Sequence, residues 1–159
     1  MEKLFIGSDK SGFNLKEAVK AYLVENKYEF EDIGTLEEDN AYPFFEVAEK
    51  GAKLIQDGTY NRGILICGTG MGMSIVANKH EGVHGAACET TFTAEKARAI
   101  NDANILCMGR WIIAPIVGVE MAKVFLETEF TQNLEDWRAV NLRNAKIEVS
   151  KIEKSSFNK

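Results

Sequence analysis

Short apolar runs alternate with segments of helical periodicity along most of this 159-residue chain. The runs predict strands at residues 4–8, 28–33, 63–67, 83–88 and 105–108. The periodic segments predict helices at residues 14–26, 44–56, 73–79, 93–100 and 116–125. Strands that alternate with helices pack in parallel, with the helices on both faces of the sheet. The pattern therefore predicts a three-layer α/β fold, Rossmann-like or flavodoxin-like, with a five-stranded parallel sheet.

A last helical segment, expected at residues 134–152, has few partners left in a core of this size. We expect one domain over residues 1–159, with its core at about residues 1–130 and a helical extension at residues 131–159. The extension is expected to pack on a neighbouring subunit. This predicts a homodimer or a homotetramer.

The composition argues against several classes of protein. The net charge of -5 argues against a nucleic-acid partner, and no apolar run approaches the length of a membrane span. Cys67, Cys88 and Cys107 are an odd number of cysteines, and each lies in or at the end of an apolar run. They indicate reduced, buried thiols in a cytoplasmic protein rather than a disulfide framework.

Three alternate glycines follow the apolar run at residues 63–67 and precede a helical segment. Such a loop offers free backbone N–H groups at a helix N-terminus, and it stands directly beside the thiol of Cys67. The loop therefore predicts an anion site next to a base or nucleophile. A tight turn that needs glycine for geometry alone is the alternative. A dinucleotide loop is disfavoured because the spacing is one residue short of G-x-G-x-x-G.

Residues 80–84, His-Glu-Gly-Val-His, match the H-E-x-x-H pattern of zinc proteases. That pattern binds zinc only when both histidines share one face of a helix. Gly82 lies at its centre and the segment falls where a helix ends and a strand begins. We therefore expect no metal here.

Charged residues in two further places could serve a ligand. Asp9 and Lys10 follow the first strand, where they could cap a turn, or could bind sugar hydroxyls and an anionic group. Arg138 and Arg143 could be solvated helix charges, or could reach a phosphate on a neighbouring subunit.

Several separated motifs agree in order with one family. They are Gly7-Ser8-Asp9, residues 12–16 (Gly-Phe-Asn-Leu-Lys), residues 32–35 (Asp-Ile-Gly-Thr), Tyr42-Pro43, residues 63–75 and 77–79 around the glycine loop, and residues 101–106. Over about residues 3–127 the chain resembles the ribose-5-phosphate isomerase B and galactose-6-phosphate isomerase family. The resemblance implies a Rossmann-like fold, an active site between two subunits, and cofactor-free, metal-free interconversion of an aldose phosphate and a ketose phosphate.

The resemblance also implies roles for individual residues. Cys67 would be the base that moves a proton between C1 and C2, and Thr69 would assist at the hydroxyl. Backbone N–H groups of the loop would hold the enediolate oxygen, from Gly68, Gly70, Met71, Gly72, Met73 and Ser74. Asp9, Tyr42 and Asn101 would contact the substrate, with Lys10, Arg138 and Arg143 available to its phosphate.

The chain also departs from the family. Ile100 stands where a histidine usually opens the sugar ring, Lys10 replaces a second histidine, and the stretch from Trp111 to Val119 is longer than usual. These departures leave three hypotheses open. The first is an isomerase of ribose 5-phosphate or of a related pentose or tetrose phosphate, including a four-carbon substrate that forms no ring. The others are the cysteine-bearing subunit of a heteromeric galactose-6-phosphate isomerase, and a non-catalytic phosphosugar-binding protein.

Overall fold

A computed structural model describes residues 3–157 and contains one five-stranded sheet in that range. Its strands are β1 (Leu4–Ser8), β2 (Phe30–Asp32), β3 (Arg62–Cys67), β4 (Gly85–Ala87) and β5 (Ile105–Gly109). All pair in parallel in the order β2-β1-β3-β5-β4. The predicted parallel sheet is confirmed. In the flavodoxin order the fourth strand lies next to the third. Here β5 lies next to β3, and β4 forms an edge of the sheet.

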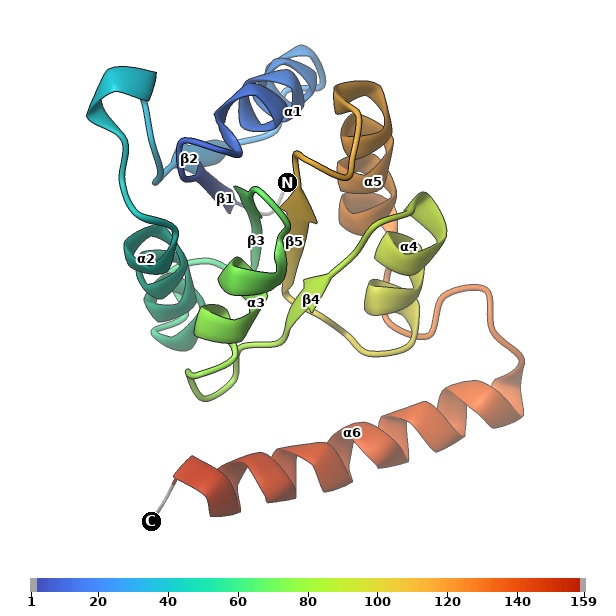
Figure 1. Cartoon of the computed structure of the whole chain (residues 1–159). Helices are drawn as coiled ribbons and strands as arrows, with labels where there is room; N and C mark the ends of the chain where they lie inside the picture. Colours follow the sequence, from blue (N-terminus) through green and yellow to red (C-terminus); the bar gives the residue numbers. More distant parts are fainter. Residues whose placement is uncertain (1–2, 158–159) are drawn as a thin grey trace.

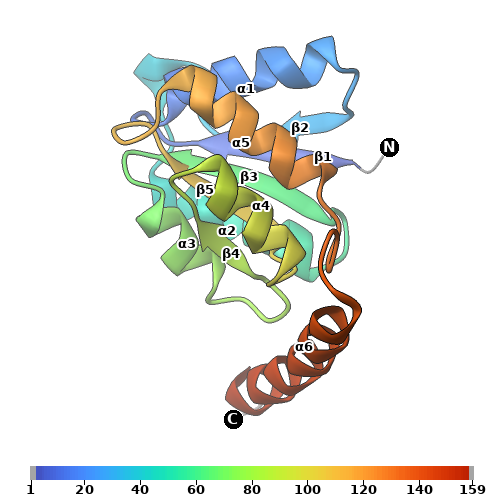
Figure 2. The same ribbon diagram turned by 90° about the vertical axis from the view of Figure 1, so that its right-hand side faces the viewer.

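Helices cover both faces of this sheet, as the sequence predicted. They are α1 (Phe13–Glu25), α2 (Phe44–Gln56), α3 (Met71–Ala77), α4 (Thr91–Ala99), α5 (Pro115–Glu127) and α6 (Asp136–Phe157), with a 3₁₀ turn at Glu38–Asn40. Helices α1, α4 and α5 pack together on one face, and α2 and α3 on the other (Figures 1 and 2). Most predicted boundaries fall within about two residues of those observed, as is usual for helix ends.

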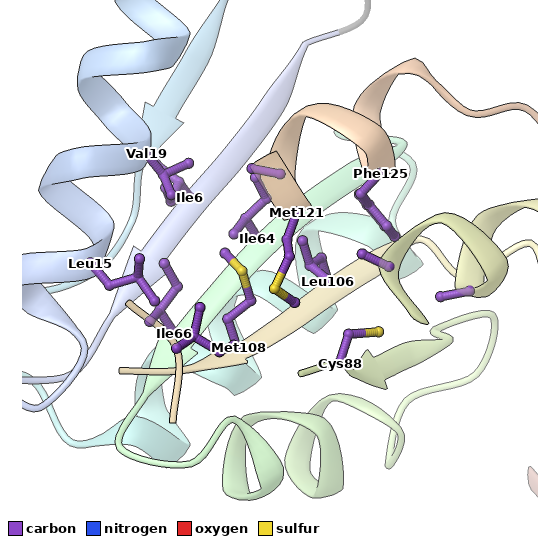
Figure 3. Close-up of a cluster of buried hydrophobic side chains, with 14 of the residues drawn as sticks. Ile6, Leu15, Val19, Ile64, Ile66, Cys88, Leu106, Met108, Met121 and Phe125 are labelled. Carbon is purple, nitrogen blue, oxygen red and sulfur yellow. The ribbon is translucent and has the colours of Figure 1, made fainter. Parts of the chain in front are cut away.

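Alternation along the strands divides the core into two clusters. Ile64 and Ile66 of β3 point towards α1 and α5, where they meet Leu106 and Met108 of β5 (Figure 3). Leu65 and Cys67, one residue along, point towards α2 and α3. Both faces of β3 are therefore buried, which explains its uninterrupted apolar run.

The connections after β1 and β3 form a topological switch point. These strands are neighbours, but β1 is followed by α1 on one face and β3 by α3 on the opposite face. Ligands of open α/β sheets bind at such a switch point, beyond the carboxyl ends of the strands. The end of β3 at Cys67 lies at this point.

Helix α6 lies beyond the opposite, amino edge of the sheet and projects away from the core (Figures 1 and 2). Its Lys146 pairs with Asp102, and the Glu153 carboxylate accepts a hydrogen bond from the N–H of Gly82 at 2.8 Å. Of its described residues only Ala139 is buried. Its exposed apolar side chains are Trp137, Val140, Ile147, Val149, Ile152 and Phe157. Packing of this helix on a neighbouring subunit stays a prediction.

A buried ion pair joins helix α1 to strand β2. The Lys16 side chain is completely buried, and its Nζ donates to Asp32 Oδ2 at 2.6 Å and to the carbonyl of Thr35. Burial alone would raise the pKa of Asp32, but hydrogen bonds from Lys16 and Lys20 hold this pKa below its usual value. Two of the family-like motifs, residues 12–16 and 32–35, thus contact each other through this buried ion pair.

We predict that Asp32→Ala lowers the free energy of unfolding by about 3–5 kcal/mol at pH 7, because it leaves the buried Lys16 ammonium without its carboxylate. Urea unfolding measures this loss. Glu29→Ala, at an exposed position just before β2, is the control and should change stability by less than about 0.5 kcal/mol.

The pH dependence provides a second check. Since the pKa of Asp32 is lowered by folding, its contribution is present above its unfolded pKa of about 3.9 and is lost as the pH falls through its folded pKa. The difference between wild type and Asp32→Ala should therefore shrink in acid. A difference that stays constant down to pH 2 would contradict this assignment.

Candidate active site

Cys67 is the last residue of β3 and therefore lies at the topological switch point of the sheet. Its side chain is largely buried, and the Sγ accepts a hydrogen bond from the N–H of Gly70 at 3.1 Å. The loop therefore folds back over the sulfur and directs a backbone donor at it. Burial raises the pKa of Cys107 and of Cys88, so these two thiols are held in the neutral form inside the fold.

The glycine loop is pressed against the end of β5. Gly70 has a φ of +78°, and a Cβ there would lie 2.8 Å from the backbone carbon of Met108. A Cβ on Gly109 would lie 2.5 Å from the backbone of Thr69. Neither position accommodates a side chain, so close approach of two backbones requires glycine on both sides. Geometry therefore requires glycine at position 70 of the loop, and this requirement is compatible with a binding role.

The backbone donors of the loop differ in what they already bind. The N–H of Met71 donates weakly to Thr69 Oγ1 at 3.4 Å, whereas those of Gly72 and Met73 have no acceptor within residues 3–157. The N–H of Ser74 donates to the Gly70 carbonyl, and the Ser74 hydroxyl donates to the Gly85 carbonyl at 2.8 Å. Ser74 is therefore engaged in joining α3 to β4, and a contact with substrate is least favoured there.

Two aromatic rings pack on the loop from different elements. A Cβ on Gly68 would lie 2.9 Å from the ring of Trp111, and a Cβ on Gly72 would lie 2.8 Å from the ring of Phe44. These rings fix the loop between the start of α2 and the segment after β5. The sequence pattern predicted a site role for neither ring, although Trp111 lies two residues beyond the end of β5, where site residues are expected.

Asp9 and Lys10 extend the site to the end of β1. The Asp9 N–H donates to the carbonyl of Ile66, and its Oδ1 accepts from the N–H of Gly12 at 2.9 Å. The turn function expected of Asp9 is therefore present. Burial raises the pKa of this carboxyl, against the lowering effect of its backbone hydrogen bonds. Lys10 is exposed at the same edge.

Tyr42 lies beside a cavity at the end of β2. Its N–H donates to Thr35 Oγ1 at 3.1 Å, and its half-exposed side chain lines a cavity of about 270 Å³ together with Asp32, Gly34 and Glu46. Tyr42 thus stands at the carboxyl edge of the sheet, as expected of a residue that contacts substrate.

Asn101 does not join this group within one chain. Helix α4 runs back from the carboxyl edge, so Ile100 and Asn101 at its end lie at the amino edge. There they line a cavity of about 290 Å³ against α6, with Phe130, Leu142 and Val149. The tail arginines belong to α6 at the same edge, where Arg143 donates to Thr131 Oγ1 at 3.0 Å. Asn101, Arg138 and Arg143 are thus separated from Cys67 by the length of the sheet.

The two histidines do not form a metal site. Helix α3 ends at Ala77, before His80, so His80 and His84 share no helix. His84 Nε2 instead lies 3.6 Å from Glu153 Oε1 of α6. Among residues 3–157, no group of three His, Cys, Asp or Glu side chains could hold a metal ion. None of the described helices combines the length and apolarity needed to cross a membrane.

A parallel sheet with a thiol and free amides at its switch point is typical of a class of protein, the α/β proteins that bind a small anionic molecule at this edge. Comparison with known proteins specifies the family. The family model described as Ribose/Galactose Isomerase matches residues 4–142, so the chain belongs to this family. The resemblance drawn from the motifs is confirmed, and so is the identification of an isomerase.

Individual relatives differ in how much of the chain they match. The 4-deoxy-4-sulfo-D-erythrose isomerase of Clostridium sp. strain MSTE9 is 61% identical over 157 residues, covering 99% of each chain. The ribose-5-P isomerase B of Listeria innocua serovar 6a is 41% identical, covering 81% of this chain and 86% of its own. The solved structure of Clostridium thermocellum ribose-5-phosphate isomerase B is 32% identical, with a TM-score of 0.86 and coverage of 97% and 99%.

We predict that Gly70→Ala is more destabilising than Gly82→Ala. Both glycines have a φ of +78°, which costs any other residue about 1–2 kcal/mol, but a Cβ on Gly82 meets nothing within 4 Å. At Gly70 the overlap with Met108 should add about 1–3 kcal/mol. Urea unfolding of the two variants measures the difference, and equal losses would contradict the packing described for the loop.

Proposed function

We propose that this protein converts an open-chain four-carbon aldose with a terminal anion into its ketose, and that its substrate is 4-deoxy-4-sulfo-D-erythrose. The observation that carries this proposal is the 61% identity to the Clostridium isomerase over 99% of both chains, α6 included. The Listeria ribose-phosphate relative is less similar and covers 81% of the chain.

The residue at position 100 supports a substrate without a ring. A five-membered sugar ring needs a hydroxyl at C4, and a sulfonate at C4 removes it. Such an aldose stays open or hydrated in water, so the enzyme needs no group that opens a ring. Ile100, which cannot transfer a proton, lies among the apolar side chains of Phe130, Leu142 and Val149. An isoleucine at this position is consistent with a substrate that needs no ring opening.

The proton transfer would centre on Cys67. In the thiolate form its sulfur takes the proton from C2 of the aldose, and the electron pair moves through C1 to leave an enediolate. The O2 proton passes to O1, where Thr69 is placed to assist, and Cys67 returns its proton to C1 to give the ketose. Two features of the loop support this role: the donor from Gly70 to the sulfur, and the free N–H groups of Gly72 and Met73, available to the enediolate oxygen.

A second copy of the chain would complete the site. Cys67 lies at one edge of the sheet and Asn101 at the other, so both reach one substrate only if two chains associate. Exposed apolar side chains at both edges support this arrangement, among them Phe45, Met71 and Ile75 near the loop and Ile147 on α6. Lys10 of one chain and Arg138 or Arg143 of the other would then bind the terminal anion. We infer a homodimer or homotetramer.

We predict that the purified protein exchanges the C2 proton of 4-deoxy-4-sulfo-D-erythrose in heavy water, as followed by NMR. Cys67→Ala should abolish this exchange, since it removes the base. Cys107→Ala, which removes a thiol in the interior of β5, is the matched control and should retain it. The purified protein should process D-ribose 5-phosphate far more slowly, because that sugar is cyclic. Exchange that survives Cys67→Ala, or that appears only when a second, different chain is added, would contradict the proposal.

Mixing two inactive variants tests the shared site. Cys67→Ala and Asn101→Ala should each lose turnover as pure proteins. After unfolding and refolding together, half of the dimers carry one intact site, so about a quarter of wild-type activity should return. No recovery, with mixed dimers demonstrated by mass spectrometry, would show that one chain must supply both Cys67 and Asn101, and it would contradict the shared site.

A further inference from the structure

We propose that Trp111 determines the specificity of the isomerase, forming the wall of the substrate pocket that limits the length of the sugar chain. This inference rests on the proposed function and extends it from the reacting carbons to the rest of the substrate. Three observations support it: the position of the indole ring on Gly68, the backbone hydrogen bonds of the segment that carries it, and the large exposed part of the ring.

The indole lies flat on the glycine loop directly beside Cys67. Three atoms of its ring system, Cε2, Cδ2 and Cε3, would lie 2.9–3.0 Å from a Cβ on Gly68. These atoms surround the bond shared by the two rings, so the face of the indole rather than its edge covers Gly68. A side chain at position 68 would displace the ring, and this explains glycine there without any requirement for an unusual backbone angle.

Backbone hydrogen bonds hold the segment that carries this ring. The Trp111 N–H donates to the Gly68 carbonyl, and the Arg110 N–H donates to the Cys67 carbonyl, both at 2.9 Å. The N–H of Ile113 donates to the Gly109 carbonyl, and the Ile113 side chain is buried in the core. The segment that carries Trp111 is therefore fixed to the thiol loop and to the core. The indole is thus carried on a fixed backbone, with one face of its ring on Gly68.

Most of the indole nevertheless remains open to solvent. Trp111 is 74% exposed, although one face of its ring contacts Gly68. Supporting Gly68 requires only that face, and a smaller apolar side chain could supply it. Trp111 follows the end of β5 by two residues, and so lies at the carboxyl edge, where an α/β fold binds its ligand. A large aromatic surface there is suited to line a pocket, because it excludes water and occupies volume at low entropic cost.

This position gives the ring a steric function. The reacting carbons must lie at Cys67, and the adjoining Gly68 is covered by the indole. The bulk of the ring thus reduces the space next to the reacting end for the remaining carbons. A four-carbon chain fits a shortened pocket, whereas each additional carbon must displace the ring. Discrimination by one carbon in such a pocket is typically about 10–200-fold.

The experiment compares two open-chain inhibitors, 4-phospho-D-erythronate and 5-phospho-D-ribonate, which differ by one carbon and need no ring opening. Calorimetry gives their dissociation constants for wild type, Trp111→Ala and Trp111→Phe. Trp137→Phe, which alters the other exposed tryptophan of the chain, is the matched control. Wild type and control should prefer the four-carbon acid. Trp111→Ala should reduce this preference about tenfold or more by admitting the longer acid, with Trp111→Phe between them.

Fluorescence gives a readout that does not depend on the alanine variant. In Trp137→Phe, Trp111 is the sole tryptophan, and 4-phospho-D-erythronate should change its emission with the dissociation constant found by calorimetry. If both acids weaken equally in Trp111→Ala, or the emission does not respond, Trp111 only supports the loop and this inference alone is overturned. If wild type neither binds the four-carbon acid nor turns over the four-carbon sugar, the proposed function fails and the inference falls with it.

Discussion

The close approach of two backbones at the carboxyl edge of the sheet is the contact on which the site depends. The loop after β3 touches the end of β5 so closely that neither Gly70 nor Gly109 could carry a side chain. This contact turns the loop back over Cys67 and directs the N–H of Gly70 at the sulfur. It also leaves amides at the start of α3 without acceptors. The geometry of the loop is therefore a consequence of how two parallel strands pack.

Stability and reactivity are located at different places in this fold. The contact of Lys16 with Asp32 and with the Thr35 carbonyl joins α1 to β2 and to the segment after it, and its polar groups are satisfied within the protein. The site has the opposite character, with unpaired amides, an exposed Lys10 and a large exposed indole. Buried polar groups are normally paired, so unpaired donors gathered around a thiol indicate where a ligand binds. The motifs shared with the family include residues of both kinds.

The predicted site residues lie at two opposite edges of the sheet. A helix after a parallel strand runs back to the amino edge, so residues at the start and at the end of α4 cannot act on the same ligand within one chain. Ile100 and Asn101 are at the end of α4, next to α6. In our proposal a second chain completes the site, and this would give α6 a function that the isolated chain does not provide. The indole of one chain would then limit the length of the substrate, and the tail arginines of the other would bind its terminal anion.

The sequence by itself determined the α/β class, the parallel sheet, most element boundaries and the family, because periodicity and the order of motifs are local properties of a chain. It also placed Cys67 and Asp9 at the carboxyl edge, since the ends of parallel strands meet there, whereas Tyr42 was predicted only from the family resemblance. It did not reveal that Lys16 is a buried ion-pair partner, that Ser74 is occupied by the Gly85 carbonyl, or that Phe44 and Trp111 cover the loop. Only the tertiary structure decided these points. Each depends on which segments, distant in the sequence, are brought into van der Waals contact, and no local pattern records that.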